Sequence, residues 1–272
     1  MRRAAAVLTA LAAIVMTGCA GRDRYAPTLS AAEVIGRVQG VVSLAIGPDK
    51  TVYYALASGE VYALGDDRPA LIATFPTAAL DSIAISSDGI LHGAYRDAGR
   101  LTVATWVDRA ARGFLHLRAN GPAQIAYNKN GDLLVAVGDR LADAQGHVIS
   151  NGWHSPRIAA GRDNRIWVAD DAPGTEKELV ARGREKDGAK RRRFASALPP
   201  HTDPSGIALR KDELLVCGRR LGRVYRLHIG LDDVARRRGT LAGLKCTNAI
   251  VVAPDGAVIT ATDNAILRYG AR

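Results

Sequence analysis

Polar side chains that could do chemistry recur just ahead of a repeated aliphatic triplet in this chain. Together they offer two carboxylates, two imidazoles, a guanidinium, an amide and an indole, which would suit a polar ligand or a cation if the fold gathered them. An imidazole in such a set would make binding sensitive to pH between about 5 and 8. The alternative is that these residues are polar only because they face water. The candidate ligand-binding residues are Asp81, Trp153, His154, Arg157, His201, Asp203 and Asn248.

Motifs of common enzyme classes are missing from the sequence. It contains no Gly-X-Ser-X-Gly, no His-Glu-X-X-His, no Cys-X-X-Cys and no phosphate-binding glycine loop. We therefore assign no catalytic residue, expect no metal and no cofactor, and expect any chemistry to depend on residues that the fold brings together.

A repeated pattern supplies the elements that would position the candidate residues. Each copy is a short apolar run, a turn rich in Asp or Asn, and a second apolar run, which is the pattern of a β-hairpin. The starts of the copies lie 39, 42, 33, 49 and 43 residues apart, a period typical of a four-stranded propeller blade. The six copies begin at Leu44, Ile83, Ile125, Ile158, Ile207 and Ile250.

The repeat predicts an all-β fold, a six-bladed β-propeller over residues 33–272. A sandwich would not repeat one signature six times, and solenoid periods are shorter. Ala follows the first aliphatic residue in five of the copies, which suits an inner strand where the blades converge. The last blade lacks a strand at the C-terminus, and residues 33–38 can supply it and close the ring. The loops entering the inner strands then meet at one mouth of the central channel.

The repeat resembles that of NHL-repeat and gluconolactonase-like propellers. The closest matches are the segments 205–209 and 164–170. The resemblance covers roughly residues 39–269, and it implies a fold shared by many functions. Gluconolactonase-like enzymes hold a divalent metal with Glu, Asn and Asp. Asn248 resembles the Asn, and Asp203 or Asp81 could serve as the Asp, but the position of the Glu falls on Gln39 or Val42.

The N-terminus has the order of an export signal. Two arginines precede an apolar run over residues 4–16 that would rise roughly 20 Å as a helix, too short for a hydrocarbon core of about 30 Å. Residues 16–19 resemble a bacterial lipobox, which implies cleavage after residue 18 and a lipid such as palmitate on Cys19. Residues 1–18 are therefore the predicted signal peptide and 19–32 a lipidated tether. We expect an exported lipoprotein of the cell envelope on the extracytoplasmic side of a membrane.

The chain is basic, with a formal net charge of +10. Such an excess favours anionic partners, and the run ending in Arg191, Arg192 and Arg193 could contact anionic lipid or a wall polymer. The alternative is a solvated loop. Nucleic acid is not an expected partner because no aromatic residues interleave with the basic runs.

Two cysteines remain beyond Cys19, and an even pair outside the cytoplasm predicts a disulfide between Cys217 and Cys246. The function we expect is a binding platform at the channel mouth for an unknown small molecule or protein. The alternative is a gluconolactonase-like, metal-assisted hydrolase, or a lyase, at the same mouth.

Overall fold

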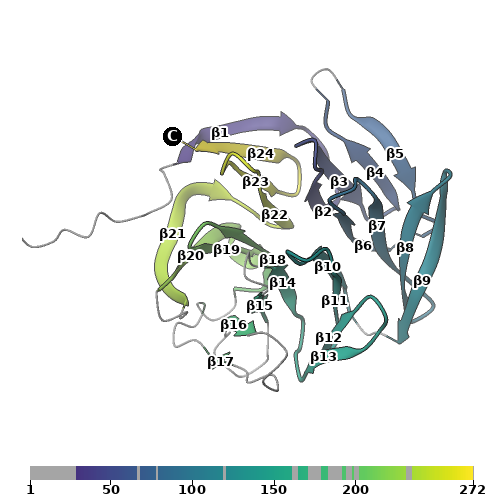
Figure 1. Ribbon diagram of the computed structural model, residues 1–272. Helices are drawn as coiled ribbons and strands as arrows, with labels where there is room; N and C mark the ends of the chain where they lie inside the picture. Colours follow the sequence, from purple (N-terminus) through teal and green to yellow (C-terminus); the bar gives the residue numbers. More distant parts are fainter. Residues whose placement is uncertain are drawn as a thin grey trace, which may run out of the picture.

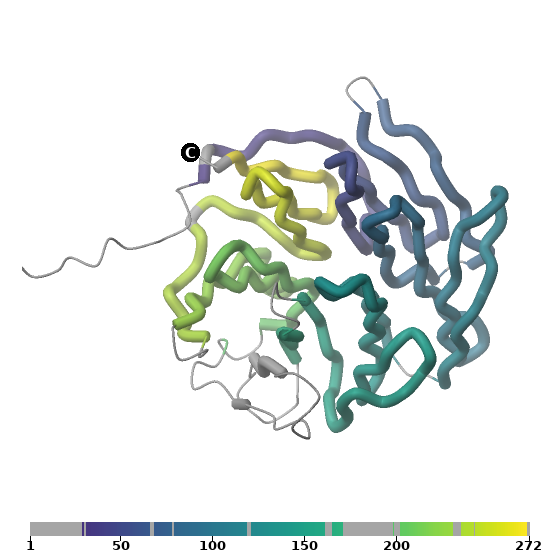
Figure 2. Tube along the Cα trace, viewed as in Figure 1, coloured from purple at the N-terminus to yellow at the C-terminus, as the bar shows by residue number. Residues whose placement is uncertain are grey.

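The chain folds as an all-β propeller, in which four-stranded blades surround a central channel (Figure 1). This is a computed structural model of the protein. The strands follow the ring in chain order, and the tube in Figure 2 shows each blade turning outward from the channel. The described residues are 29–65, 68–77, 79–118, 121–160, 165–170, 179–182, 192–193, 198, 202–230 and 235–271.

The strands of the described part of the chain form six four-stranded sheets, each antiparallel and ordered from the channel outward. The first three follow the chain without a crossover. Blade one contains β2 (Val41–Ile46), β3 (Val52–Leu56), β4 (Glu60–Ala63) and β5 (Ala70–Thr74). Blade two contains β6 (Leu80–Ile85), β7 (Leu91–Asp97), β8 (Arg100–Val107) and β9 (Ala110–Arg118). Blade three contains β10 (Gln124–Tyr127), β11 (Leu133–Val137), β12 (Arg140–Asp143) and β13 (Val148–Asn151).

The next two blades repeat this order, with one 3-10 turn, η2 (Arg219–Leu221), between strands of the second. Blade four contains β14 (Arg157–Ala160), β15 (Ile166–Ala169), β16 (Leu179–Arg182) and β17 (Arg192–Arg193). Blade five contains β18 (Pro204–Arg210), β19 (Glu213–Gly218), β20 (Arg223–Ile229) and β21 (Ala235–Lys245).

The sixth blade closes the ring as predicted. Its inner strands β22 (Ala249–Val252), β23 (Val258–Ala261) and β24 (Ile266–Ala271) come from the C-terminus. Its outer strand β1 (Leu29–Gly36) comes from the N-terminus and pairs antiparallel with β24. The strand begins at Leu29, inside the segment 19–32 that was expected to be a tether, because backbone pairing with β24 extends to that residue.

The hydrophobic core lies between neighbouring blades. One cluster joins Trp167 of blade four, which is 2% exposed, to Leu214 and Tyr225 of blade five. Similar clusters fill the other junctions among the described residues. Each blade is therefore held mainly by side chains that alternate toward its neighbours, which fixes the inner strands around the channel.

A disulfide joins blade five to the loop that enters blade six. Cys217 lies on β19 and Cys246 just before β22, with 5.5 Å between the Cα atoms, within the range for an unforced bond. Both residues are buried. The predicted pairing is confirmed.

The predicted lipid on Cys19 and the predicted contact of Arg191 with an anionic partner concern residues outside the described part of the chain. Arg192 and Arg193 form β17, the outermost strand of blade four, so the basic run reaches the rim of the propeller. No helix within the described residues is long and apolar enough to span a membrane.

Candidate functional site

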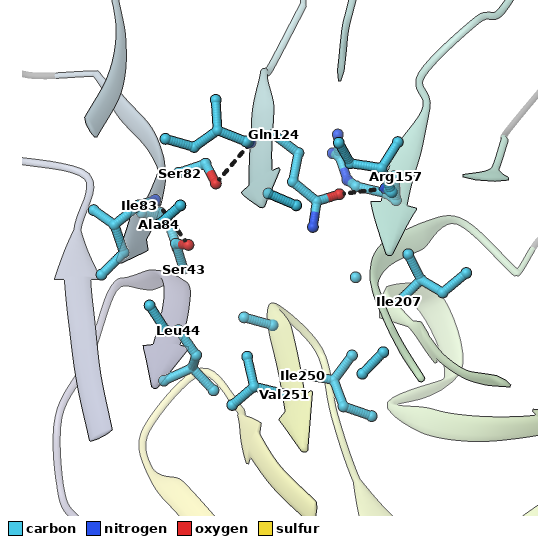
Figure 3. A pocket seen from close by; sticks show the side chains of 18 of the residues that line it. Ser43, Leu44, Ser82, Ile83, Ala84, Gln124, Arg157, Ile207, Ile250 and Val251 are labelled. Atoms are coloured by element: carbon cyan, nitrogen blue, oxygen red, sulfur yellow. Dashed lines mark hydrogen bonds between the residues drawn. The ribbon is translucent and has the colours of Figure 1, made fainter. Parts of the chain in front are cut away.

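A cavity of about 580 Å³ occupies the central channel. The inner strand of every blade contributes to its wall, as the ring of side chains in Figure 3 shows. Three of the predicted site residues line it: Asp81, Arg157 and Asn248. The positional argument from the repeat therefore predicted where these three residues lie, and their binding of a ligand stays a prediction.

A row of hydrogen bonds links the inner strands at the polar mouth. Ser43 accepts the backbone N–H of Ile83 at 3.1 Å, and Ser82 accepts that of Ile125 at 3.2 Å. Gln124 accepts the N–H of Ile158 at 2.7 Å (Figure 3). In blades one, two and three, the residue one position before the aliphatic triplet thus joins its blade to the next blade.

Arg157 occupies the same position in blade four but cannot act in the same way. A guanidinium has only donors, so it cannot accept the N–H of the following blade. Its side chain is buried, with the residue 6% exposed, and lines the cavity. Among the described residues the Arg157 side chain makes one hydrogen bond, in which Nη1 donates to the carbonyl of Pro156 over a long distance of 3.5 Å. The other guanidinium donors are therefore available to a ligand.

The electrostatic surroundings of Arg157 are mixed. Burial, together with the charge of Arg219, lowers the pKa of Arg157 to about 10, and the charges of Asp81, Asp203 and Asp170 oppose the shift. The guanidinium therefore stays protonated at neutral pH. No ion pair joins it to a carboxylate within the described part of the chain, so its charge is balanced only at longer range.

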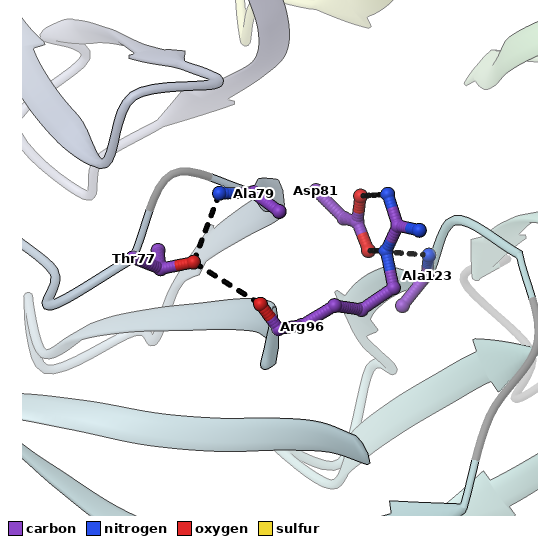
Figure 4. A network of polar contacts seen from close by, with 5 residues as sticks. All are labelled: Thr77, Ala79, Asp81, Arg96 and Ala123. Atoms are coloured by element: carbon purple, nitrogen blue, oxygen red, sulfur yellow. Dashed lines mark hydrogen bonds and ion pairs between the residues drawn. The ribbon is translucent and has the colours of Figure 1, made fainter. Parts of the chain in front are cut away.

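The carboxylate of Asp81 is already engaged. Both of its oxygens bind Arg96, Oδ2 to Nε at 2.7 Å and Oδ1 to Nη2 at 2.9 Å, and Oδ2 also accepts the N–H of Ala123 at 3.1 Å (Figure 4). The Asp81 side chain is 6% exposed. Asp81 therefore ties blade two to the loop entering blade three and is not free to bind a ligand.

The other predicted carboxylate, Asp203, is free. It is half-buried in the loop before β18 and is not among the residues lining the cavity, and its side chain makes no hydrogen bond among the described residues. Its backbone has φ 48°, and its carbonyl accepts the N–H of Arg219 at 3.0 Å. A left-handed conformation outside a hairpin turn is a feature that often marks a functional position.

Trp153 and His154 lie beside the mouth and are not among the residues lining the cavity. The indole N–H of Trp153 donates to Ser150 Oγ at 3.2 Å. The backbone N–H of His154 donates to Asp170, whose buried carboxylate also accepts the N–H of Ser155 at 2.7 Å. This loop is therefore held by Asp170, and His154 is exposed. His201 lies outside the described residues.

The mouth does not fit the divalent-metal set that the resemblance implied. Val42 occupies the position of the acidic ligand, Asp81 is bound to Arg96, and the Asn248 amide faces the Thr262 carbonyl at 3.5 Å. A buried guanidinium beside them would repel a cation. In the described part of the chain no three His, Cys, Asp or Glu residues are close enough to hold a metal ion.

Sequence reasoning missed several residues of this mouth. A serine precedes the aliphatic triplet in both of the first two repeats, and this signal could have identified Ser43 and Ser82 as linking residues. Nothing in the local sequence distinguishes Arg219 or Asp170 from other charged residues. Only the folded chain brings them near Arg157.

Comparisons with known proteins establish the fold alone. No protein-family model and no curated protein matches the chain. Among solved structures, the PQQ-bound aldose sugar dehydrogenase of Streptomyces coelicolor is similar with a TM-score of 0.72 and 16% identity over 90% of this chain and 99% of that one. A gluconolactonase of Xanthomonas campestris is similar with a TM-score of 0.71 and 12% identity over 92% of this chain and 96% of that one. A streptogramin B lyase is similar with a TM-score of 0.63 and 13% identity over 89% of this chain and 97% of that one.

Proposed function

We propose that the channel mouth is a small-molecule site for a carboxylate or the corresponding lactone, and that the protein is a hydrolase acting there. One observation carries this proposal. Arg157 is buried at the cavity wall with most of its donors unused, in a position where three other blades have a hydrogen-bond acceptor. A planar guanidinium binds a carboxylate through two parallel hydrogen bonds, and it can equally stabilise a carbonyl oxygen that becomes negative.

The residues of the mouth allow a hydrolysis without a metal. Arg157 would donate to the carbonyl oxygen of the lactone. Asp203 does not line the cavity, but its charge reaches Arg157, and it would take a proton from the attacking water as general base. The bond from the carbonyl carbon to the ring oxygen then breaks, and the ring oxygen receives that proton. The product is a hydroxy carboxylic acid, which ionises and pairs with Arg157.

The fold comparisons support an enzyme better than an interaction platform. The similar propellers include an aldose sugar dehydrogenase, a gluconolactonase and a lyase, each named for the turnover of a small molecule. Because the identities are low, this support concerns the kind of molecule handled and gives no substrate.

Binding without turnover is the second candidate function. The observation that favours it is the misfit between the mouth and the metal set of gluconolactonase-like enzymes, with Val42 in the acidic position and Asp81 bound to Arg96. In that case the protein would hold a carboxylate at Arg157 and release it unchanged.

Substitution Arg157→Gln tests the site. We expect the purified protein to bind butyrate, and the variant to bind it about tenfold to a hundredfold more weakly, because a charge-assisted hydrogen bond is lost. Isothermal titration calorimetry measures the affinity. Arg220→Gln is the matched control, since Arg220 is exposed and does not line the cavity.

Turnover is followed in the same preparations with gluconolactone and with an alkyl lactone, δ-decalactone. The hydrolase predicts an activity that EDTA leaves unchanged and that Asp203→Asn abolishes, while binding without turnover predicts none. Equal butyrate affinity in the native protein and in Arg157→Gln would reject both candidates. Reduction of an electron acceptor by an aldose, seen only with added PQQ, would replace the hydrolase with a dehydrogenase.

We also propose that lipid on Cys19 holds the propeller to a membrane of the cell envelope. The support is the resemblance of residues 16–19 to a lipobox behind a short apolar run. Labelled palmitate should enter the native protein, and Cys19→Ala should remove the label and release the protein from membranes. An unlabelled native protein that stays soluble would overturn this assignment.

A further inference from the structure

The channel below the polar mouth is walled by aliphatic side chains. The first two residues of every triplet line the cavity, and they are Leu, Ile, Ala or Val in all six blades. Figure 3 shows Leu44, Ile83, Ile207 and Ile250 around the open centre. The polar side chains of the mouth thus give way to aliphatic side chains within one residue step, although each inner strand pairs on one side only and its backbone groups also contribute to the wall.

The far end of the channel is apolar as well. The third residues of the triplets, all half-buried, form its rim: Ile46, Ile85, Tyr127, Ala160, Leu209 and Val252. Tyr127 is the one hydroxyl in this ring, and it is hydrogen-bonded to His92 Nδ1 at 2.9 Å. Burial lowers the pKa of His92, so this partner is neutral at pH 7. The rim therefore presents no charge to the channel.

The depth of the channel below Arg157 sets the size of what can enter. From Arg157, at the mouth, to Ala160, at the far rim, the inner strand of blade four rises roughly 10 Å at about 3.3 Å per residue. The cavity volume of about 580 Å³ is that of a site for a small organic molecule. A polyhydroxylated chain at this depth would find few side-chain partners for its hydroxyl groups, whereas an alkyl chain would gain from leaving water.

We infer that the ligand of this protein is amphipathic, with its carboxylate or lactone at Arg157 and an aliphatic chain extending down the channel. This inference rests on the proposed function, because it takes Arg157 as the site of the polar group. It adds the chemical class of the remainder of the molecule, a medium-length alkyl chain.

A chain-length series tests the inference on the native protein. Butyrate, hexanoate and octanoate share a carboxylate headgroup and differ in the length of the alkyl chain. Octanol has an alkyl chain of about the length of that in octanoate but carries no charge. Every methylene that becomes fully buried adds up to about fourfold in affinity. We expect octanoate to bind at least about 30-fold more tightly than butyrate, and octanol to bind at least about tenfold more weakly than octanoate, as measured by titration calorimetry.

A polar group placed in the channel wall provides a second measurement. Val251 is half-buried and lines the cavity, so Val251→Asn should weaken octanoate binding by at least about tenfold, and by more than it weakens the binding of the shorter butyrate. Asparagine adds no charge that would repel the carboxylate of either ligand. Val148→Asn is the matched control, because Val148 is exposed on β13 and lies away from the cavity. Circular dichroism checks that both variants are folded, and if Val251→Asn is not, the chain-length series on the native protein decides alone.

The outcomes separate the inference from the proposal beneath it. Equal affinity for butyrate and octanoate would overturn the aliphatic chain and leave the carboxylate site intact. Octanol binding as tightly as octanoate would overturn the role of Arg157. No binding of any carboxylate would reject the proposed function and the inference together.

Discussion

Substitution Glu213→Ala should lower the free energy of unfolding by about 3 to 5 kcal/mol. Glu213 begins β19 and is 1% exposed. Its Oε1 accepts hydrogen bonds from the guanidinium of Arg226, and Arg210, 3% exposed, lies 3.9 Å from Oε2. Removing the carboxylate would take away the buried acidic group that lies beside both guanidinium groups.

This cluster also joins two blades. Arg210 Nε donates to the carbonyl of Gly256, in the hairpin turn between β22 and β23, at 3.0 Å. Burial lowers the pKa of Arg210, and the charge of Glu213 opposes that shift. Loss of Glu213 would therefore weaken the contact between blades five and six as well as the strands of blade five.

Urea unfolding followed by circular dichroism measures the effect. Arg112→Ala is the control, since it breaks the exposed ion pair between Arg112 and Asp108, and it should change the free energy of unfolding by less than about 1 kcal/mol. Glu213→Gln keeps the shape of the side chain, and its loss of unfolding free energy should lie between those of Glu213→Ala and Arg112→Ala. A loss below about 1 kcal/mol in Glu213→Ala would show that water or rearrangement compensates the buried charges.

The disulfide should contribute about 3 to 4 kcal/mol to stability. Cys217 and Cys246 are separated by 29 residues in the sequence, and closing a loop of that size restricts the unfolded chain by roughly this amount. The double variant Cys217→Ala, Cys246→Ala should therefore unfold at lower urea. Alanine is preferred to serine because both sites are fully buried and a new hydroxyl would lack a partner.

Reduction provides the matched control for this variant. The native protein unfolded in urea with a thiol reductant should show a similar loss, whereas the double variant should be insensitive to the reductant. Native protein that keeps its stability after complete reduction would contradict the prediction, and thiol titration under denaturing conditions verifies that reduction is complete.

Much of the fold followed from the sequence. The repeated triplets and turns predicted the all-β propeller, and the missing strand at the C-terminus predicted closure by the N-terminus, seen in the pairing of β1 with β24. The pairing of Cys217 with Cys246 followed from their being the two cysteines that remain beyond Cys19. The start of β1 was misplaced because residues 29–32 carry no alternating apolar pattern, and their pairing depends on β24.

The sequence by itself placed Asp81, Arg157 and Asn248 at one end of the channel, because the period of the repeat fixes which residues precede each inner strand. It could not determine which of these side chains remain free. Arg96, 15 residues after Asp81, neutralises that carboxylate, while Arg157 keeps unused donors. Hydrogen bonds and ion pairs depend on a few ångströms between side chains of different strands and loops. Only the tertiary structure sets those distances, and so it alone made Arg157 the centre of the candidate site.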